Sequence, residues 1–131
     1  MRISIDEIFD LLSWNSSEEK QKKGVDLAGR IHNLSVLIMP MESKATWENC
    51  AKVFVNKKDK ELQVYYVALF EWLKDMNWPG AYLIFDRLMH IPDEYFLPAY
   101  QYSYRLAEQT QDCSWMMALE DLLNERNNKT D

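Results

Sequence analysis

Apolar and polar residues recur with a helical period along most of the chain. After Asp59, apolar and aromatic residues return every three or four positions as far as Met76, which places them on one broad face of an α-helix. The same spacing in residues 5–12 and in five further segments predicts shorter helices. Seven helices are therefore predicted, starting near residues 5, 18, 46, 59, 79, 98 and 114.

Residues that favour the first turn of a helix precede most of these apolar stripes. The serine pair at 16–17 stands before two glutamates, and Thr46 and Ser114 stand before apolar runs. We expect a hydroxyl group in each place to cap free backbone amides. Proline fixes φ at a value that suits the first helical turn. Pro79 and Pro98 are therefore expected to lie at the starts of the fifth and sixth helices.

The connections between helices carry more specific expectations. Residues 75–80 should form a tight corner, after which the fifth helix packs against the fourth with Asp86 and Arg87 turned toward solvent. Residues 93–96 should form an acidic loop before the sixth helix. The segment 35–41 is apolar, short and interrupted by a proline, so it is expected to be a buried connector and not a strand.

The composition supports an all-α fold. Only 3 Gly and 4 Pro occur in 131 residues, so the chain offers few turn signals for β-hairpins. Its 47% hydrophobic content is ample for one continuous core. We expect a single helical domain over residues 1–131, made of antiparallel helix pairs joined by short corners. These pairs would form either a HEAT-like right-handed stack or a compact irregular bundle.

The charge balance restricts the class of partner. The chain has 15 Lys and Arg against 21 Asp and Glu, a formal net charge of −6, which opposes direct binding to the phosphate backbone of nucleic acids. A basic protein partner is expected, although the acidity could equally serve solubility alone. No apolar run approaches the roughly 20 residues that a bilayer requires, and the first residues contain no signal-peptide core. The protein is therefore expected to be cytoplasmic, with no membrane partner.

The residues best suited to covalent or metal chemistry are scattered. The only cysteines and histidines are Cys50, Cys113, His32 and His90. They fall on different predicted elements without CxxC or zinc-ligand spacing, and no nucleotide-binding, hydrolase or zinc-protease motif occurs. We expect no cofactor, no metal and no catalytic residue, and hence a protein that is not an enzyme.

Residues 69–81 carry the most specific motif of the chain. They read L-F-E-W-L-K-D-M-N-W-P-G-A, which resembles the W-L-x-D-x-N-W-P-x-A signature of an uncharacterised bacterial domain family with HEAT-like helical pairs. The resemblance covers roughly the second half of the chain and none of the first forty residues. It implies a helical-repeat fold in small proteins, some of which are similar to immunity proteins against bacterial toxins. A structural interpretation of the motif is also open, in which Trp72 and Trp78 fill a helix corner and Asp75 or Asn77 caps free amides.

Aromatic residues are abundant near acidic ones in the second half of the chain. The 5 Trp, 7 Tyr and 5 Phe make up 13% of the residues, and such side chains are favoured in protein interfaces. They could instead lie at the edge of the core with their polar ends in water. The candidate partner-binding residues are Asp75, Trp78, Asp86, Asp93, Glu94, Tyr95, Tyr100 and Tyr104.

Two functions follow from these observations. The first is an immunity or antitoxin-like protein whose acidic, aromatic face covers the basic substrate cleft of a bacterial toxin, such as a nuclease. The alternative is a helical-repeat adaptor that holds a peptide or helix through apolar contacts in a housekeeping complex. Binding through charge should weaken as ionic strength rises, whereas apolar packing should hardly respond.

Overall fold

The computed structural model describes residues 4–41 and 43–128, and every regular element within them is helical. The α-helices are α1 (Ile5–Leu12), α2 (Glu18–Ala28), α3 (Trp47–Val55), α4 (Asp59–Leu62), α5 (Tyr66–Glu71), α6 (Ala81–Leu88), α7 (Asp93–Gln109) and α8 (Cys113–Asn128). The 3-10 helices are η1 (Leu34–Leu37), η2 (Lys44–Thr46), η3 (Gln63–Tyr65) and η4 (Trp72–Lys74). The prediction of an all-α fold is therefore confirmed.

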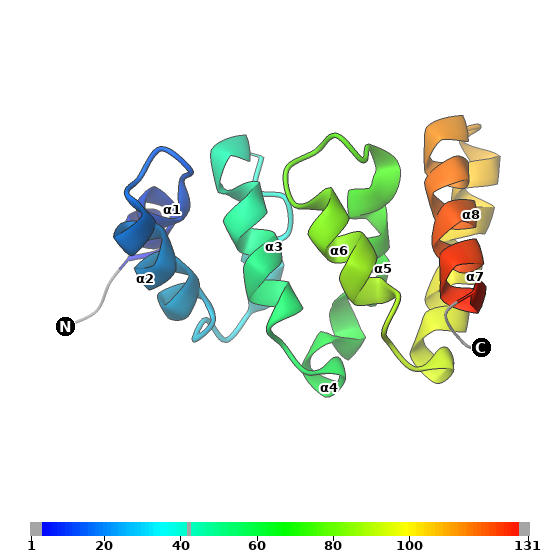
Figure 1. Cartoon of the computed structure of the whole chain (residues 1–131), viewed down its shortest axis with the longest axis horizontal. Helices are drawn as coiled ribbons and strands as arrows, with labels where there is room; N and C mark the ends of the chain where they lie inside the picture. The colour runs from blue at the N-terminus through cyan, green and yellow to red at the C-terminus, as the bar shows by residue number, and fades with distance from the viewer. Residues whose placement is uncertain (1–3, 42, 129–131) are drawn as a thin grey trace.

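The helices stand side by side along the long axis of the molecule in two layers (Figure 1). The pairs α1/α2, α5/α6 and α7/α8 run antiparallel, and α3 stands between α2 and α6. Helix α3 contacts both α2 and α6 in one layer, while α5 contacts α7 in the other. No helix among the described residues is long and apolar enough to cross a membrane.

The first pair of helices is held together by a very close approach. Ser17 caps α2 by accepting a hydrogen bond from the amide of Lys20, as predicted from the serine pair. One turn before the end of that helix, Gly24 is buried against α1, and a Cβ atom there would lie 2.9 Å from the Cβ atom of Leu11. The absence of a side chain at this position is what lets the two helices touch.

Two tryptophans anchor the core of the second half. Trp72 and Trp115 are both almost completely buried. The indole of Trp72 donates to the carbonyl oxygen of Pro79 at 2.9 Å, and the indole of Trp115 donates to that of Phe70 at 3.0 Å. Because each buried indole N–H has a partner, these rings add apolar area without an unpaired donor. The first bond ties η4 to Pro79, just before α6, and the second ties α8 to α5.

The predicted long fourth helix is interrupted. Between Asp59 and Lys74 the chain passes through α4, η3, α5 and η4 instead of one continuous α-helix. A 3-10 turn holds 3.0 residues, so each residue advances about 120° in place of 100°. Trp72 and Leu73 are both buried in the core, as the predicted stripe required. Apolar spacing alone does not distinguish this arrangement from a regular helix, because both bury the same residues.

The corner after η4 differs from the prediction in its key residue. Pro79 is not the first residue of the next helix, since α6 starts at Ala81 and Gly80 precedes it with a left-handed φ of 85°. A Cβ atom on Gly80 would lie 2.6 Å from the Cβ atom of Ala51 and 3.0 Å from the carbonyl oxygen of Trp47. The corner therefore depends on a glycine pressed against α3. Helix α6 contacts α5 and η4, as predicted, and α3 as well.

The predicted start of the sixth helix and the predicted cap of the third are also wrong. Helix α7 begins at Asp93, so the expected acidic loop is its first turn and Pro98 lies inside it. The acids suit the positive end of the helix dipole, and burial of Phe96 offsets the one backbone hydrogen bond that Pro98 removes. Thr46 makes no cap, because its hydroxyl donates to the carbonyl of Ser43 at 2.8 Å.

The last helix takes its cap from an aspartate and not from the predicted serine. Asp112 accepts a hydrogen bond from the amide of Trp115 at 3.1 Å, which is the geometry of an N-cap side chain. Ser114 lies within the first turn of α8. The predicted inward face of this helix is confirmed, since the buried residues are Trp115, Ala118, Leu119 and Leu122.

Candidate functional site

The eight residues proposed from the sequence do not form one cluster. Figure 1 shows the connection from η4 to α6 at the top of the molecule and the connection from α6 to α7 at the bottom. Asp75 and Trp78 belong to the first connection, whereas Asp93 and Glu94 open α7 after the second. The two corners are neighbours in sequence but lie at opposite ends of the helix layer. A single interface centred on both corners is therefore not what the fold presents.

The corner at residues 75–80 has the structural role that its motif allowed. Trp78 is half-buried and meets the ring of Trp47 edge-to-face at 5.6 Å, and Trp47 in turn meets Trp72 at 6.3 Å. The carboxylate of Asp75 accepts a hydrogen bond from the amide of Asn77 at 2.8 Å. These contacts fix the turn. Asp75 also helps to line a surface hollow.

Tyr100 and Tyr104 of α7 form a stacked row with Phe96, whereas Tyr95 lies against Tyr66. Tyr100 stacks between Phe96 at 5.5 Å and Tyr104 at 5.9 Å. Burial raises the pKa of Tyr100, with a further contribution from the negative charge of Glu120. The hydroxyl of Tyr104 donates to Glu120 on α8, which raises the pKa of Tyr104 to about 12. These tyrosines therefore bridge α7 and α8.

The start of α7 is tied to the end of α8 through one arginine. Arg126 donates to the carboxylate of Asp93 at 2.6 Å and to the carbonyl oxygen of Met89 at 2.9 Å, and its guanidinium lies 4.2 Å from the centre of the Phe96 ring. Glu94 is exposed.

The two residues of α6 that were expected to face solvent differ in outcome. Arg87 does not point freely to solvent as predicted, because it donates to Asp59 at 2.7 Å. Asp86 is exposed, as predicted.

A surface groove lies between α6 and α8, with η4 at one end. It consists of two adjoining hollows of about 620 and 560 Å³ that share Met76, Ala118 and Asp121. The first hollow is lined by Met76, Tyr82, Phe85, Asp86, Met89, Ala118, Asp121, Asn124, Glu125 and Asn128. The second is lined by Lys74, Asp75, Met76, Asn77, Asp112, Ser114, Met117, Ala118 and Asp121. We call the two together the acidic groove.

Negative charge dominates the acidic groove. Its lining contains five carboxylates, Asp75, Asp86, Asp112, Asp121 and Glu125, and one cation, Lys74. That lysine is engaged within the protein, because its ammonium group lies 3.9 Å from Glu71 and 4.8 Å from the centre of the Trp115 ring. Within residues 4–41 and 43–128, Asp86, Asp121 and Glu125 form no ion pair. These three carboxylates are available to a basic ligand.

Exposed apolar side chains border the same groove. Tyr82 on α6 is 72% exposed and Met117 on α8 is 64% exposed, although both are large. Met76 and Phe85 are half-buried in the groove, and Met89 is buried there. An apolar floor with carboxylates along its sides suits a side chain that combines a hydrocarbon stem with a positive end, such as lysine or arginine.

Sequence reasoning missed the α8 side of the acidic groove. Met117, Asp121 and Glu125 are four residues apart, so they lie on one face of the helix that the sequence correctly predicted. This spacing was a usable signal for an acidic stripe. What the spacing could not reveal is that the stripe faces Asp86 of α6. Among the described residues, no group of three or more His, Cys, Asp or Glu side chains is arranged to hold a metal ion.

Comparison with known proteins gives one family. No curated protein and no solved structure matches the chain. Residues 42–130 match the family model described as Domain of unknown function (DUF5071), so the match begins after α2 and includes the acidic groove and both tryptophan anchors. Since these residues are more than half of the 131, the chain belongs to the DUF5071 family.

Proposed function

We propose that this protein binds a basic surface of another protein in its acidic groove, and that it acts as an immunity-type inhibitor that covers the functional surface of a toxin. The acidic groove is the observation that carries this proposal. Asp86 of α6 and Asp121 and Glu125 of α8 line it from two sides without internal ion pairs among the described residues. A catalytic centre is not needed for this activity, because occlusion alone stops the toxin.

The charge of the groove supports recognition of lysine and arginine side chains. Carboxylates form charge-assisted hydrogen bonds with both, and with arginine the pair is frequently bidentate. A cluster of unpaired negative charge also steers a basic partner during diffusion and raises the association rate. The overall formal charge of −6 acts in the same direction at longer range.

The border of the groove supports a protein partner in particular. Tyr82 and Met117 expose apolar surface at positions where a peptide or helix could cover them. Methionine adapts its shape to an incoming side chain, and tyrosine gives rigid contact area with a polar end. The same apolar floor would also suit the alternative function, an adaptor that holds a peptide or helix mainly by packing.

The proposal is tested by co-expressing the tagged protein with the product of the adjacent gene, and by expressing that product alone. We expect the neighbour to inhibit growth, and co-expression to restore growth and give a complex on affinity capture. Binding should weaken markedly between about 0.05 and 0.5 M salt. A harmless neighbour that forms no complex contradicts the immunity function, and a complex that is insensitive to salt favours the adaptor.

A paired set of variants tests the site itself. Asp86→Lys combined with Asp121→Lys should slow association by about tenfold or more at low salt, because two charges that steer the partner change sign. Asp6→Lys combined with Asp10→Lys is the matched control, since both are exposed acids on α1, outside the groove, and the change in net charge is the same. Equal association rates for the double variant and the control would show that the partner binds elsewhere.

A further inference from the structure

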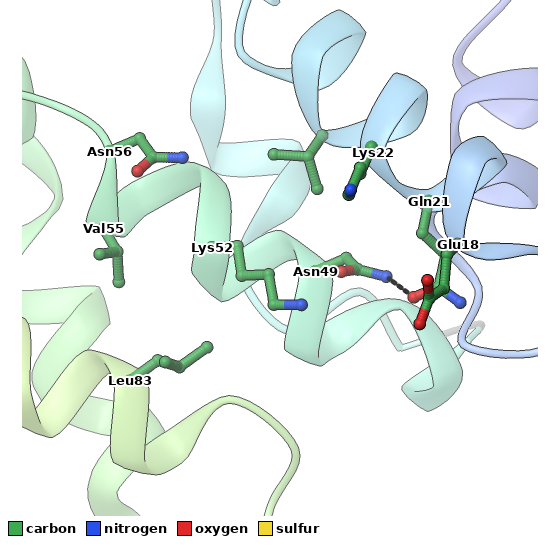
Figure 2. A pocket seen from close by; sticks show the side chains of 9 residues that line it. Glu18, Gln21, Lys22, Asn49, Lys52, Val55, Asn56 and Leu83 are labelled. Atoms are coloured by element: carbon green, nitrogen blue, oxygen red, sulfur yellow. Dashed lines mark hydrogen bonds between the residues drawn. The ribbon is translucent and has the colours of Figure 1, made fainter.

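A second hollow, of about 710 Å³, lies between α2, α3 and α6 (Figure 2). Its lining residues are Glu18, Gln21, Lys22, Val25, Asn49, Lys52, Val55, Asn56 and Leu83. A volume of this size falls in the range of pockets that take small molecules, which is roughly 300–1,000 Å³. None of these residues belongs to the acidic groove, although α6 contributes to both.

Hydrogen bonds hold two walls of this hollow in a fixed position. Asn49 of α3 is 2% exposed, and its amide donates to the carbonyl oxygen of Leu12 at 2.6 Å and to the side chain of Gln21 at 3.0 Å. The amide of Gln21 in turn donates to the carbonyl oxygen of Ser16 at 2.7 Å. Figure 2 shows the contact between Asn49 and Gln21 across the gap between α3 and α2. The spacing of these helices is therefore set before any ligand arrives.

Two lysines reach this hollow from two neighbouring helices. Lys22 comes from α2 and Lys52 comes from α3, one helical turn after Asn49 (Figure 2). Within the part of the chain that the structure describes, neither ammonium group forms an ion pair or a hydrogen bond. Glu18 is the single acidic residue of the lining. The hollow is thus locally positive in a protein whose net charge is negative.

The remaining lining gives the ligand an apolar part. Val25 of α2, Val55 of α3 and Leu83 of α6 are half-buried and line the hollow, and the amide of Asn56 lies on the same face of α3 as Lys52 and Asn49. A ligand that satisfies every part of this lining has negative groups at the lysines and a hydrocarbon body over the aliphatic side chains. Because the two positive charges come from separate helices, two negative groups joined by a short chain fit better than one.

We propose that this hollow is a binding site for a small organic dicarboxylate, held by Lys22 and Lys52 with its hydrocarbon chain over Val25, Val55 and Leu83. The site is separate from the acidic groove and of the opposite sign, so it serves a different ligand from the basic partner. Leu83 faces the dicarboxylate site, whereas Tyr82 and Asp86 of the same helix line the acidic groove. The failure of either proposal leaves the other standing.

The test is a titration of the ¹⁵N-labelled full chain with adipate at pH 7, followed by amide chemical shifts. We expect saturable shifts in α2 and α3 around Lys22, Asn49 and Lys52, and none at Asp121 in the acidic groove. Adipamide has the same chain length without charge and is the ligand control. It should cause no saturable shift, because the lysines would have no charged partner.

Variants decide whether the lysines hold the ligand. Lys22→Gln and Lys52→Gln should each weaken adipate binding by at least about fivefold, as expected when one charge-assisted contact is lost. Lys23→Gln is the matched control, because Lys23 is an exposed neighbour on α2 that does not line the hollow. Adipate shifts that do not saturate, saturable binding of adipamide, or unchanged affinity in both lysine variants would each overturn the proposal.

Discussion

Replacement of Gly80 by alanine should strongly destabilise the protein. Gly80 has a φ of 85° at the start of α6, a backbone conformation that costs a residue with a side chain roughly 1–2 kcal/mol. The new Cβ atom would also lie 2.6 Å from the Cβ atom of Ala51 and 3.0 Å from the carbonyl oxygen of Trp47. Both neighbours belong to α3, so relief of the overlap requires α3 and α6 to move apart.

The cost of the left-handed backbone conformation and the cost of the Cβ overlap can be added, because one concerns a backbone angle and the other the packing of two helices. Overlap in a packed core typically costs about 1–3 kcal/mol, so the free energy of unfolding should fall by roughly 2–5 kcal/mol in total. A domain of this size has a total stability of about 5–15 kcal/mol. The expected fall in Tm is roughly 7–18 °C, given the entropy of unfolding of a chain of this length.

Thermal and urea unfolding followed by circular dichroism measure this effect directly. The matched control is Gly29→Ala, because Gly29 has an ordinary φ of −64° and its added Cβ atom would approach no neighbour closer than 3.4 Å. That variant should unfold within about 1 kcal/mol of the natural protein. If Gly80→Ala unfolded at the same urea concentration as Gly29→Ala, the argument from backbone angle and overlap would be refuted.

Three further predictions concern groups in or near the core. Ser103→Ala should raise the stability by about 1 kcal/mol in urea unfolding, because the buried Ser103 hydroxyl has no hydrogen-bond partner among the described residues and alanine removes that unpaired group; a loss of stability would reveal a partner. At pH 8 a thiol reagent should modify one cysteine per native chain and two per unfolded chain. Cys113 is exposed, whereas burial raises the pKa of Cys50 to about 12. Two fast reactions in the native protein would disprove this. Tyr104 should remain protonated at pH 11 in a tyrosine NMR titration, because its hydroxyl donates to Glu120 and its pKa is raised from 10.0 to about 12. Since the raised pKa favours the protonated form, this hydrogen bond stabilises the fold fully below pH 10 and is lost between about pH 10 and pH 12. Glu120→Gln should return the Tyr104 titration toward its ordinary range, and an unchanged titration curve would contradict the assigned cause.

The locations of helices were predictable where they depend on local spacing. The spacing of apolar side chains identified α1 from residues 5–12 and α8 from the segment after Ser114. The buried face of α8 was also the predicted one. Exact helix starts were less predictable. Pro79 and Pro98 have the chemistry of a first turn, yet neither is the first residue of a helix, because side chains elsewhere decide which turn is buried. Thr46 precedes α3 as expected, but its side chain does not cap that helix.

The candidate site was predictable only in part. Two of the eight candidate residues, Asp75 after η4 and Asp86 on α6, do line the acidic groove. Trp78 and Tyr100 instead pack against other rings, and Asp93 is paired with Arg126. Proximity in the sequence was a poor guide here, because a helix carries its two ends to opposite sides of the layer. The binding roles of all eight residues remain predictions.

The sequence by itself determined that this protein is all-helical, acidic and rich in apolar stripes, because these properties depend on the residue types and on spacings of three and four positions. Only the tertiary structure decided which stripes face one another. Asp86 and Asp121 are 35 positions apart and line one groove, and Lys22 and Lys52 come from separate helices to another. The physical reason is that a groove is formed between packed helices, and the buried residues that set their spacing, such as Gly24, Gly80 and Trp115, lie far from one another along the chain.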